Sequence, residues 1–539
     1  MAVIADHVVA VIAQISPFVV ASTILLVSGI CLSYLLSAPS AVLHFWASLP
    51  TVGIRDEWFS WTLGVIRSFK GTKAMAFEGY EKYSKKGQYF LIPSADRGPM
   101  VVIPPSDIKH VMNLPESVIA AHRSQNETIQ TDYTLHPKIV YNNFHMNVLR
   151  NQLTRNLGAL TDAIVEELDV GFSEHWGLDT HWKELEAWPS CMKIVSGASN
   201  RAFIGLPCCR DPVLLDLLRD YAMSVFGGAT VLNMLPPSFR PVAGQIVKFR
   251  TSRLAKKCLN KCLPEIEKRL EHNRRKREDV KYNWEPPGDG LQWVIDEAYK
   301  QDDPSQLSPT LIGHRFLFLN FVSMHSTSFT ITNTILDLYS SPRAEEFVAG
   351  LREECERLLK ESGGVWTKEA VNNMVRVDSA LRESMRASNF GILALPRKIV
   401  SPGGLKLPNG TTIPEGVATL IPMEPIHQDE SIYPNAATYN AFRFCEKGAL
   451  RSILDTNSAS EPVKKSAVSL DDSFVSFGIG KHACPGRFFA LYEMKLMLAH
   501  IVLNYDVEFM KERPGHFNVM WLRLPSDKVK INIRKRAEV

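Results

Sequence analysis

The sequence predicts a mainly α-helical protein with a small β-sheet region, preceded by one N-terminal transmembrane helix. Three observations support this fold class. Apolar residues recur at helical spacing along most of the chain after about residue 56, strand patterns are few and clustered, and residues 8–43 contain no Asp, Glu, Lys or Arg. With 45% hydrophobic and 22% charged residues, the composition is that of a packed globular protein and excludes a disordered or collagen-like chain.

The charge-free N-terminal stretch is long enough to cross a membrane. Residues 18–36 are almost wholly apolar, and a helix of about 20 residues spans the hydrocarbon core of a bilayer. A cleaved signal peptide is the alternative, but the stretch is too long for its apolar region and no Lys or Arg precedes it. We therefore expect residues 1–46 to form a membrane anchor, with its transmembrane helix at about residues 18–36, and residues 47–55 to form a hinge.

Charge and cysteine usage predict where the rest of the chain lies. Arg55, Arg67, Lys70 and Lys73 follow the anchor and no basic residue precedes it, which indicates a cytoplasmic C-terminal side. The nine cysteines lack the spacing of a disulfide framework and are typical of cytosolic thiols. The formal net charge of +4 is too near balance for a nucleic-acid-binding protein. We expect a single-pass membrane protein with a cytosolic body.

The body, residues 56–539, is predicted to be one large domain. Helical periodicity extends over residues 147–170, 211–226, 244–271, 311–339, 343–362 and 377–387. Strand patterns predict a hairpin from residues 88–92 and 100–103, and short strands within residues 405–421 around two turns. Residues 285–290 and 447–472 are predicted surface loops. The basic run at residues 268–281 is predicted to be a solvated helix face, with docking of an acidic redox partner as the alternative.

The main candidate for chemistry is Cys484, within the stretch FGIGKHACPG at residues 477–486. Glycines on both sides permit a tight turn, so that backbone N–H groups can point at the sulfur while a large flat ligand approaches. A helical pattern follows at residues 487–503, and the positive end of such a helix favours a thiolate. A buried core thiol is the alternative. A zinc site is disfavoured because two further ligands at a familiar spacing are missing.

This stretch resembles the haem-binding signature of the cytochrome P-450 family, Phe-x-x-Gly-x-(His or Arg)-x-Cys-x-Gly. A chance match in a chain of this length has a probability on the order of 10⁻⁴. The resemblance implies that Cys484 is the axial ligand of a haem b iron and that His482 faces a haem propionate. Phe477, Gly478 and Gly486 would belong to the same haem-binding loop.

Two further motifs follow the family's order along the chain. Glu383 and Arg386 match the Glu-x-x-Arg of the family's K helix, where both residues share one helix face. The spacing is unspecific alone, but these residues precede the predicted strands and the segment YNAFRF at residues 439–444. That segment resembles the family's Phe-x-Pro-x-Arg-Phe, with Ala441 in place of the proline. The resemblance implies that Arg443 joins Glu383 and Arg386 in a structural network that fixes the cysteine loop.

Arg397 lies in the segment LPRK, where the family commonly places a basic residue against a propionate. A bidentate contact between Arg397 and a carboxylate would suit this position. A solvated strand residue is the alternative.

The predicted helix at residues 311–339 contains VSMHST at residues 322–327, which resembles the family's (Ala/Gly)-Gly-x-(Asp/Glu)-Thr-(Thr/Ser). Here His325 replaces the acid and Ser326 the alcohol, and Thr327 follows. His325 could relay protons because its ordinary pKa lies near neutrality. A polar patch in a buried helix is the alternative. A histidine at this position is similar to that of fungal ent-kaurene oxidases and indole-diterpene oxygenases.

The resemblance implies an enzyme that reduces haem iron in two one-electron steps, cleaves dioxygen and inserts oxygen into a C–H bond. The chain contains no flavin or nicotinamide fingerprint, so electrons would come from NADPH through a separate reductase in the endoplasmic reticulum membrane, with cytochrome b5 as a further candidate donor. Apolar residues 390–395, 521–522 and those before Val322 suggest an apolar small-molecule substrate such as a terpenoid. A reductase-independent haem-thiolate isomerase or dehydratase and a non-catalytic haem- or lipid-binding protein are the alternatives.

Overall fold

The computed structural model describes residues 40–408, 410–445 and 466–537. Within these residues, no helix is both long and apolar enough to cross a membrane. The predicted transmembrane helix at residues 18–36 lies outside them. In the predicted hinge, Val52 is 2% exposed and its N–H donates to the carbonyl of Leu91 at 3.0 Å, so this part of the segment is bound to the first strand of the sheet.

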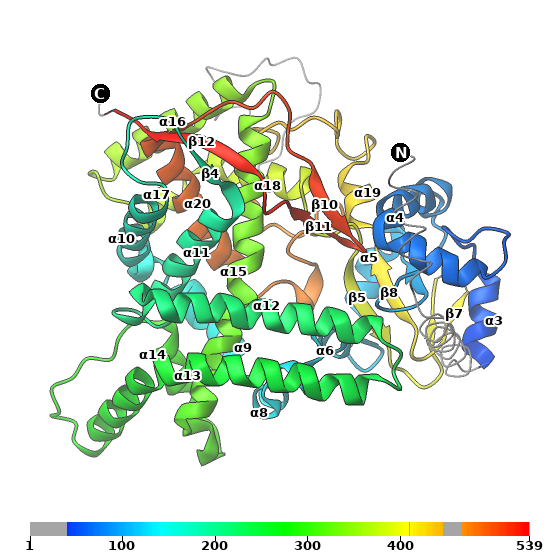
Figure 1. The fold of residues 1–539 in the computed structure, drawn as a ribbon, viewed down its shortest axis with the longest axis horizontal. Helices are drawn as coiled ribbons and strands as arrows, with labels where there is room; N and C mark the ends of the chain where they lie inside the picture. Colours follow the sequence, from blue (N-terminus) through cyan, green and yellow to red (C-terminus); the bar gives the residue numbers. More distant parts are fainter. Residues whose placement is uncertain (1–39, 409, 446–465, 538–539) are drawn as a thin grey trace, which may run out of the picture.

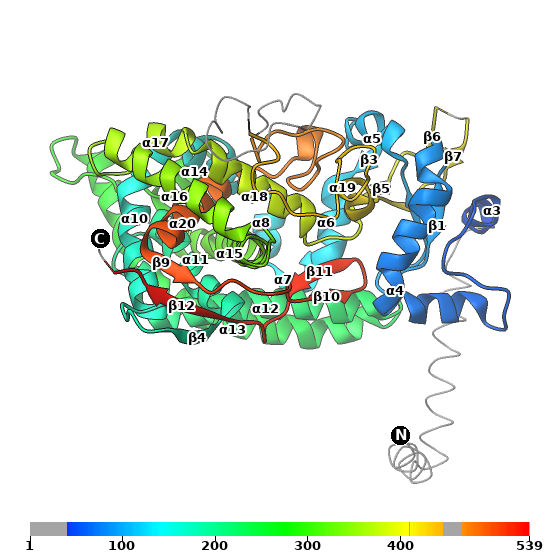
Figure 2. The same ribbon diagram turned by 90° about the horizontal axis from the view of Figure 1, so that it is seen from above.

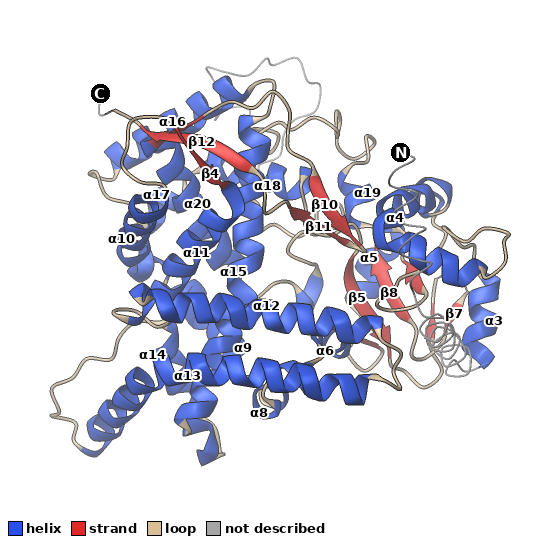
Figure 3. Cartoon of the chain, viewed as in Figure 1, coloured by secondary structure: helices blue, strands red, loops and turns tan. Residues whose placement is uncertain are grey.

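Most of the described chain is helical, and the helices fill the larger part of the molecule (Figures 1 and 3). The longer helices are α4 (Ser60–Lys82), α10 (Leu157–His175), α11 (Ala187–Phe203), α12 (Pro212–Met234), α13 (Arg240–Glu278), α15 (Pro309–Tyr339), α16 (Ala344–Glu361), α18 (Val375–Ala387) and α20 (Arg487–Asn504). The shorter helices are α3 (Ser40–Ser48), α5 (Pro105–Met112), α6 (Ala121–Ile129), α7 (Thr131–Thr134), α8 (Pro137–Tyr141), α9 (His145–Asn147), α14 (Gly290–Ala298), α17 (Lys368–Asn372) and α19 (Met423–His427). All six segments with helical periodicity are therefore helical.

Strands form small separate sheets. They are β1 (Phe90–Ile92), β2 (Met100–Val102), β3 (Ile119–Ala120), β4 (Lys183–Glu186), β5 (Ala394–Ile399), β6 (Leu405–Lys406), β7 (Thr412–Ile413), β8 (Ala418–Ile421), β9 (Tyr505–Val507), β10 (His516–Val519), β11 (Leu522–Pro525) and β12 (Lys530–Lys535). Strands β4 and β12 lie near α16 and α17, whereas β5, β7 and β8 lie towards the other end of the molecule (Figure 3). The largest sheet has the order β1-β2-β8-β5-β3, and β1 and β2 form the predicted hairpin. An irregularity between Ala394 and Arg397 interrupts the pairing of β5 with β8.

Helix α15 runs through the centre of the helical part and contacts α11, α12, α13, α18 and α20 (Figure 2). Residues on all of its sides are buried, which explains why the helix is apolar or uncharged over most of its length. Pro309 stands at its first turn, where a missing backbone N–H costs no intrahelical hydrogen bond. The central position of α15 lets one of its faces border a cavity while the other faces pack in the core.

The structure describes the predicted loop at residues 285–290 and the basic run at residues 268–281. Residues 283–288 are irregular, and the Asp289 side chain then caps α14. Of the other predicted loop, residues 446–465 lie outside the described part. The basic run ends α13, but Arg269 is 3% exposed and pairs with Asp289 at 2.5 Å. The prediction of a solvated face was therefore wrong for Arg269, since a buried carboxylate compensates its charge.

Candidate active site

The loop around Cys484 is closed by its own backbone. The N–H of Cys484 donates to the carbonyl of Phe477 at 2.7 Å, which folds the loop back on itself. Gly478 and Gly480 have φ values of 80° and 66°, a region that other residues rarely adopt. Gly486 has an ordinary φ of −89°, but no atom lies within 4 Å of where its Cβ would be, so space is left on that side of the loop.

The sulfur of Cys484 lies at the wall of a cavity, just before the N-terminus of α20. Burial raises the pKa of the Cys484 thiol, whereas the backbone N–H groups of Gly486 and Arg487 and the charge of Arg487 oppose that rise. Hydrogen bonds from these N–H groups are the interactions that a thiolate ligand requires. Because the thiol borders a cavity, the alternative of an ordinary core thiol does not describe its environment.

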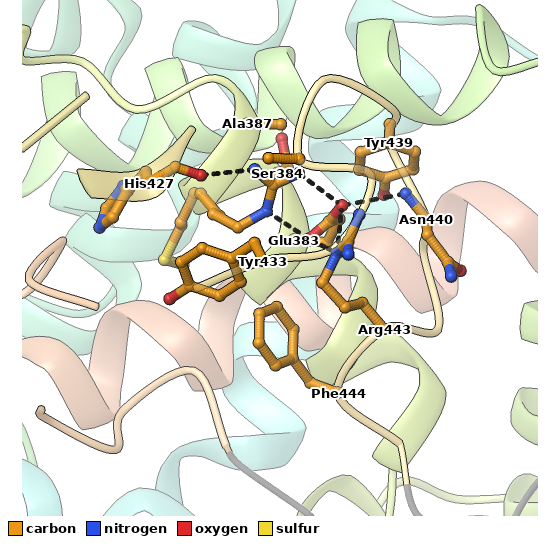
Figure 4. Close-up of polar contacts among 12 residues, drawn as sticks. Glu383, Ser384, Ala387, His427, Tyr433, Tyr439, Asn440, Arg443 and Phe444 are labelled. Atoms are coloured by element: carbon orange, nitrogen blue, oxygen red, sulfur yellow. Dashed lines mark hydrogen bonds and ion pairs between the residues drawn. The ribbon is translucent and has the colours of Figure 1, made fainter. Parts of the chain in front are cut away.

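Glu383, Arg386 and Arg443 meet in one buried ion network (Figure 4). Both oxygens of Glu383 accept hydrogen bonds from Arg386, at 2.8 and 2.9 Å, and Arg443 donates to the same carboxylate at 3.0 Å. Glu383 and Arg386 have no exposed side-chain surface, while Arg443 is 14% exposed. Two guanidinium groups thus compensate one fully buried carboxylate.

The network is connected to the cysteine loop through hydrogen bonds. Arg386 donates to the carbonyl of His427 at 2.6 Å, and the imidazole of His427 accepts the N–H of Val475 at 3.3 Å. The hydroxyl of Ser476 donates to the carbonyl of Met385 at 3.2 Å. These bonds hold the residues immediately before Phe477 against α18 and α19, so the network acts on the position of the cysteine loop.

Arg397 and His482 belong to a cationic cluster at the edge of the loop. Arg397 is 2% exposed, and its Nη2 has no hydrogen-bond partner among the described residues, which does not fit a solvated strand residue. Burial lowers the pKa of Arg397 to about 10. Nε2 of His482 lies 3.2 Å from Oε1 of Glu116. Burial lowers the pKa of His482, and the charges of Arg397 and Arg150 lower it further, whereas the charge of Glu116 opposes this change. Nη1 of Arg397 donates to the carbonyl of Pro396 at 3.0 Å, and the unpartnered Nη2 of this buried guanidinium is suited to a carboxylate ligand.

The cavity contains about 690 Å³ of space that protein atoms do not fill. It is lined by Ser326, Thr327, Thr330 and Asn333 of α15, by Ser384, Met385, Ser388, Asn389 and Phe390 at and after the end of α18, and by Met423, Ser476, Phe477, Cys484, Ala490 and Met494. The cavity thus brings Cys484 and Phe477 together with Ser326 and Thr327, as the sequence predicts. Of the predicted substrate segments, Phe390 lines it, whereas Trp521 donates its indole N–H to Asp96 at 2.9 Å.

His325 is not among the residues that line this cavity. Its ring packs edge-on against Phe226 of α12 at a centroid distance of 5.5 Å and also contacts Phe329. Burial lowers the pKa of His325 to about 4, and its Nε2 has no partner among the described residues. The imidazole is therefore neutral near pH 7 and lies on another face of α15 than Ser326.

A polar stripe along α15 was not foreseen from the sequence. Ser326, Thr330, Asn333 and Asp337 repeat at intervals of four and three residues and therefore share one face of the helix. The hydroxyls of Ser384 and Ser388 donate to the Asp337 carboxylate at 2.5 and 2.7 Å. The spacing of these polar residues is visible in the sequence. Their contact with Ser384 and Ser388 depends on the packing of α18 against α15, which the sequence does not predict.

Comparison with known proteins identifies the family. The profile of the cytochrome P-450 family matches residues 58–533, so the chain belongs to this family. The chain is 38% identical to the cytochrome P-450 monooxygenase gloP of Glarea lozoyensis, over 92% of each chain. It is also 38% identical to okaG of Penicillium ochrochloron, over 93% of this chain and 95% of the relative, and to htyF of Aspergillus rugulosus, over 90% and 72%. Both of these relatives carry the same description, cytochrome P-450 monooxygenase. The protein is an oxidoreductase of the monooxygenase class, and its family implies haem.

Substitution of Glu383 by Gln tests the buried network. The change leaves the guanidinium of Arg386 buried without a charged partner, and we expect a loss of about 3–5 kcal/mol in stability together with a lower haem content. Glu361→Gln is the control, because Glu361 forms an exposed i,i+4 pair with Arg357 that contributes at most about 1 kcal/mol. Denaturant unfolding followed by circular dichroism measures both. Equal stability of the two variants would show that the network is dispensable.

Proposed function

We propose that this chain is a haem-thiolate monooxygenase that oxidises an apolar small molecule, a terpenoid or a related fungal secondary metabolite, by one or several oxygen insertions. The observation that carries the proposal is Cys484, which lines a cavity together with Ser326, Thr327 and Thr330 of α15 and whose sulfur accepts hydrogen bonds from backbone N–H groups. The family of the chain supports the same chemistry.

The residues present fit haem b. Cys484 would ligate the iron, while Arg397 and His482 would bind the propionates, because the unpartnered Nη2 of Arg397 lies in a cationic cluster beside the cysteine loop. A haem bound there supplies the oxygen-activating redox chemistry, to which a thiolate ligand contributes by favouring O–O cleavage. Phe477, Gly478 and Gly486 would shape the protein surface against the ring.

Proton delivery would use the alcohols of α15 rather than His325. Ser326, Thr327 and Thr330 line the cavity, whereas His325 has a pKa of about 4 and packs against Phe226. Hydroxyl groups can both accept and donate a proton, so Ser326 and Thr330 with intervening water could pass protons along this face. The polar stripe continues to Asp337, whose carboxylate pairs with the partly exposed side chain of Arg513.

Electrons would come from NADPH through a separate membrane-bound reductase, with cytochrome b5 as a second donor. The site favours an uncharged substrate, because none of the described residues that line the cavity is Asp, Glu, Lys or Arg. Met385, Phe390 and Met423 provide apolar contact area. A deprotonated or protonated substrate would find no counter-ion there.

The proposed location is the cytosolic side of the endoplasmic reticulum membrane. Large apolar side chains are exposed on α4 and the residues before it, on β10 and on α12 and α13, including Trp58 at 86%, Phe517 at 58% and Val242 at 74%. These elements lie along one edge of the molecule in Figure 2. Apolar surface of this extent is expected where a protein contacts a membrane or a partner.

The reduced, carbon monoxide-treated protein tests the central proposal. We expect wild type to show the strongly red-shifted Soret band of a thiolate-ligated haem, and Cys484→Ser to lose it because an alcohol does not replace the thiolate. Cys208→Ser, at a half-buried thiol outside the cavity, is the control and should keep the band. A retained red-shifted band in Cys484→Ser would disprove the ligand assignment.

Arg397→Leu separates the haem-binding role of Arg397 from a structural one. The change removes a buried guanidinium with an unpartnered nitrogen, so the haem-free protein should gain about 1–3 kcal/mol in stability. Loss of the charge-assisted bond to a propionate should speed haem transfer to apomyoglobin about tenfold or more. Lys398 is the neighbour of Arg397 on β5 and pairs with Glu127 of α6, so Lys398→Leu should leave haem transfer unchanged. Transfer at the wild-type rate in Arg397→Leu would contradict propionate binding.

Ser326→Ala tests proton delivery. With reductase and NADPH, we expect the ratio of product formed to NADPH consumed to fall several-fold, since a proton-donating alcohol is lost beside the oxygen-binding space. His325→Phe keeps the ring packing against Phe226 and should leave this ratio unchanged. The opposite pattern would assign the relay to His325. Undiminished product without reductase and NADPH would instead support the isomerase or dehydratase alternative, which the altered segment at residues 322–327 suggests.

A further inference from the structure

A second hollow lies away from the cysteine loop and is lined by residues of α7, α13 and the start of α15 and by the residues between α7 and α8. Figure 1 shows α8, α13 and α15 in this part of the molecule. We call it the basic groove. It contains about 580 Å³ of space that protein atoms do not fill. Four of the residues that line it are basic, namely His136, Lys248, Lys256 and His314, and none of those described there is acidic. No residue assigned to the haem-thiolate site lines this groove.

The positive charge of the basic groove is not compensated by neighbours. Among the described residues, neither Lys248 nor Lys256 forms an ion pair. The rings of His136 and His314 lie 4.7 Å apart. Burial lowers the pKa of His136, and the charges that lower it further are those of Lys138, Arg315 and Lys248. Burial also lowers the pKa of His314 to about 4, so both imidazoles are mainly neutral near pH 7 and the charge of the groove is that of Lys248 and Lys256, which attracts anionic ligands.

Neutral donors complete the groove. Tyr221 is only 3% exposed and lines the groove, yet its hydroxyl has no hydrogen-bond partner among the described residues. Nδ1 of His136 accepts the N–H of Lys138 at 3.3 Å, so the neutral ring carries its proton on Nε2, which remains a donor. The Tyr221 oxygen is not one of the buried atoms without a partner, so it reaches the space of the groove and can donate a hydrogen bond to a ligand there.

The basic groove borders an apolar surface on the same helix. Val242, Ile246 and Phe249 are 74%, 71% and 69% exposed, and their spacing places them on one face of α13. Lys248 and Lys256 line the groove, and Lys256 follows Phe249 by seven residues, so it stands at the end of the same apolar face. An apolar surface with cations at its margin matches the boundary of a bilayer, where apolar chains end and phosphate groups begin.

We propose that the basic groove binds a phosphate group. A phosphate presents several charged acceptor oxygens, which the two lysines, the two histidines and the Tyr221 hydroxyl can bind together. Anionic phospholipid at the margin of the apolar face is one source of that group, and free phosphate or a soluble phosphomonoester is the other. The proposal does not depend on the haem-thiolate function, because different residues form the two sites.

The test uses the full-length haem-loaded protein in phosphatidylcholine nanodiscs at an ionic strength of about 0.15 M, where diffuse attraction is screened. Inorganic phosphate is titrated calorimetrically in one arm. In the other arm, spin-labelled phosphatidic acid is added to the nanodiscs, and electron paramagnetic resonance measures its immobilised fraction. We expect Lys248→Ala/Lys256→Ala to weaken binding about tenfold or more, and Tyr221→Phe to weaken it several-fold.

Arg253→Ala/Lys257→Ala is the matched control, because it removes the same charge from exposed positions of α13 outside the groove. Loss of phosphate binding in the groove variants alone supports the proposal with a soluble source, and loss of phosphatidic acid immobilisation alone supports it with a lipid source. Equal weakening by the control pair would show general surface charge and overturn the proposal. Failure of the wild type to bind either probe would also overturn it. The carbon monoxide spectrum should be the same in all variants, which confirms that they are folded.

Discussion

The ion pairs of the fully buried Glu383 carboxylate are the interactions on which the position of the candidate active site depends. A carboxylate without exposed surface is tolerated only where cations and hydrogen bonds replace water, and Arg386 and Arg443 do this from two distant parts of the chain. Because each guanidinium also binds backbone carbonyls, one charge fixes several loops at once. One of these carbonyls belongs to His427, whose imidazole binds the segment that leads into the cysteine loop. Burial of the Glu383 charge costs free energy, and the network that compensates this charge fixes the geometry of the loop.

The parts of the site that could be predicted are those with local chemical requirements. The cysteine loop needs glycines at positive φ, and Gly478 and Gly480 stand there. Glu383 and Arg386 share a helix face by their spacing, and their order relative to Arg443 identified the network although two other Glu-x-x-Arg matches exist. Long helices with one polar face were also predicted correctly, because alternation between polar and apolar surroundings leaves a period in the sequence.

Elements buried on several sides were harder to predict. Helix α11 was not predicted from the sequence; it contacts α10, α12 and α15, and most of its residues are buried. The same cause hid the orientation of His325. On a helix that is buried all round, polarity does not tell which side faces the cavity, and His325 packs in an aromatic cluster next to it. The cationic cluster of Arg397, His482 and Arg150 joins residues from three separate regions, and no local pattern predicts such a meeting.

The orientation of α15 has a consequence for the chemistry of the cavity. Helix α15 directs the neutral imidazole of His325 away from the cavity. Its polar residues Ser326, Thr330, Asn333 and Asp337 share another face, and the first three line the cavity. The far end of this stripe is ionic, since Arg513 binds both Asp337 and Asn333, and Arg513 is 21% exposed. Uncharged groups therefore line the cavity, while the buried carboxylate of Asp337 pairs with the partly exposed Arg513. Arg513 compensates the charge of the Asp337 carboxylate, and the hydroxyls of Ser384 and Ser388 donate hydrogen bonds to it, so the field of the carboxylate in the cavity is weakened, which agrees with the proposed apolar substrate.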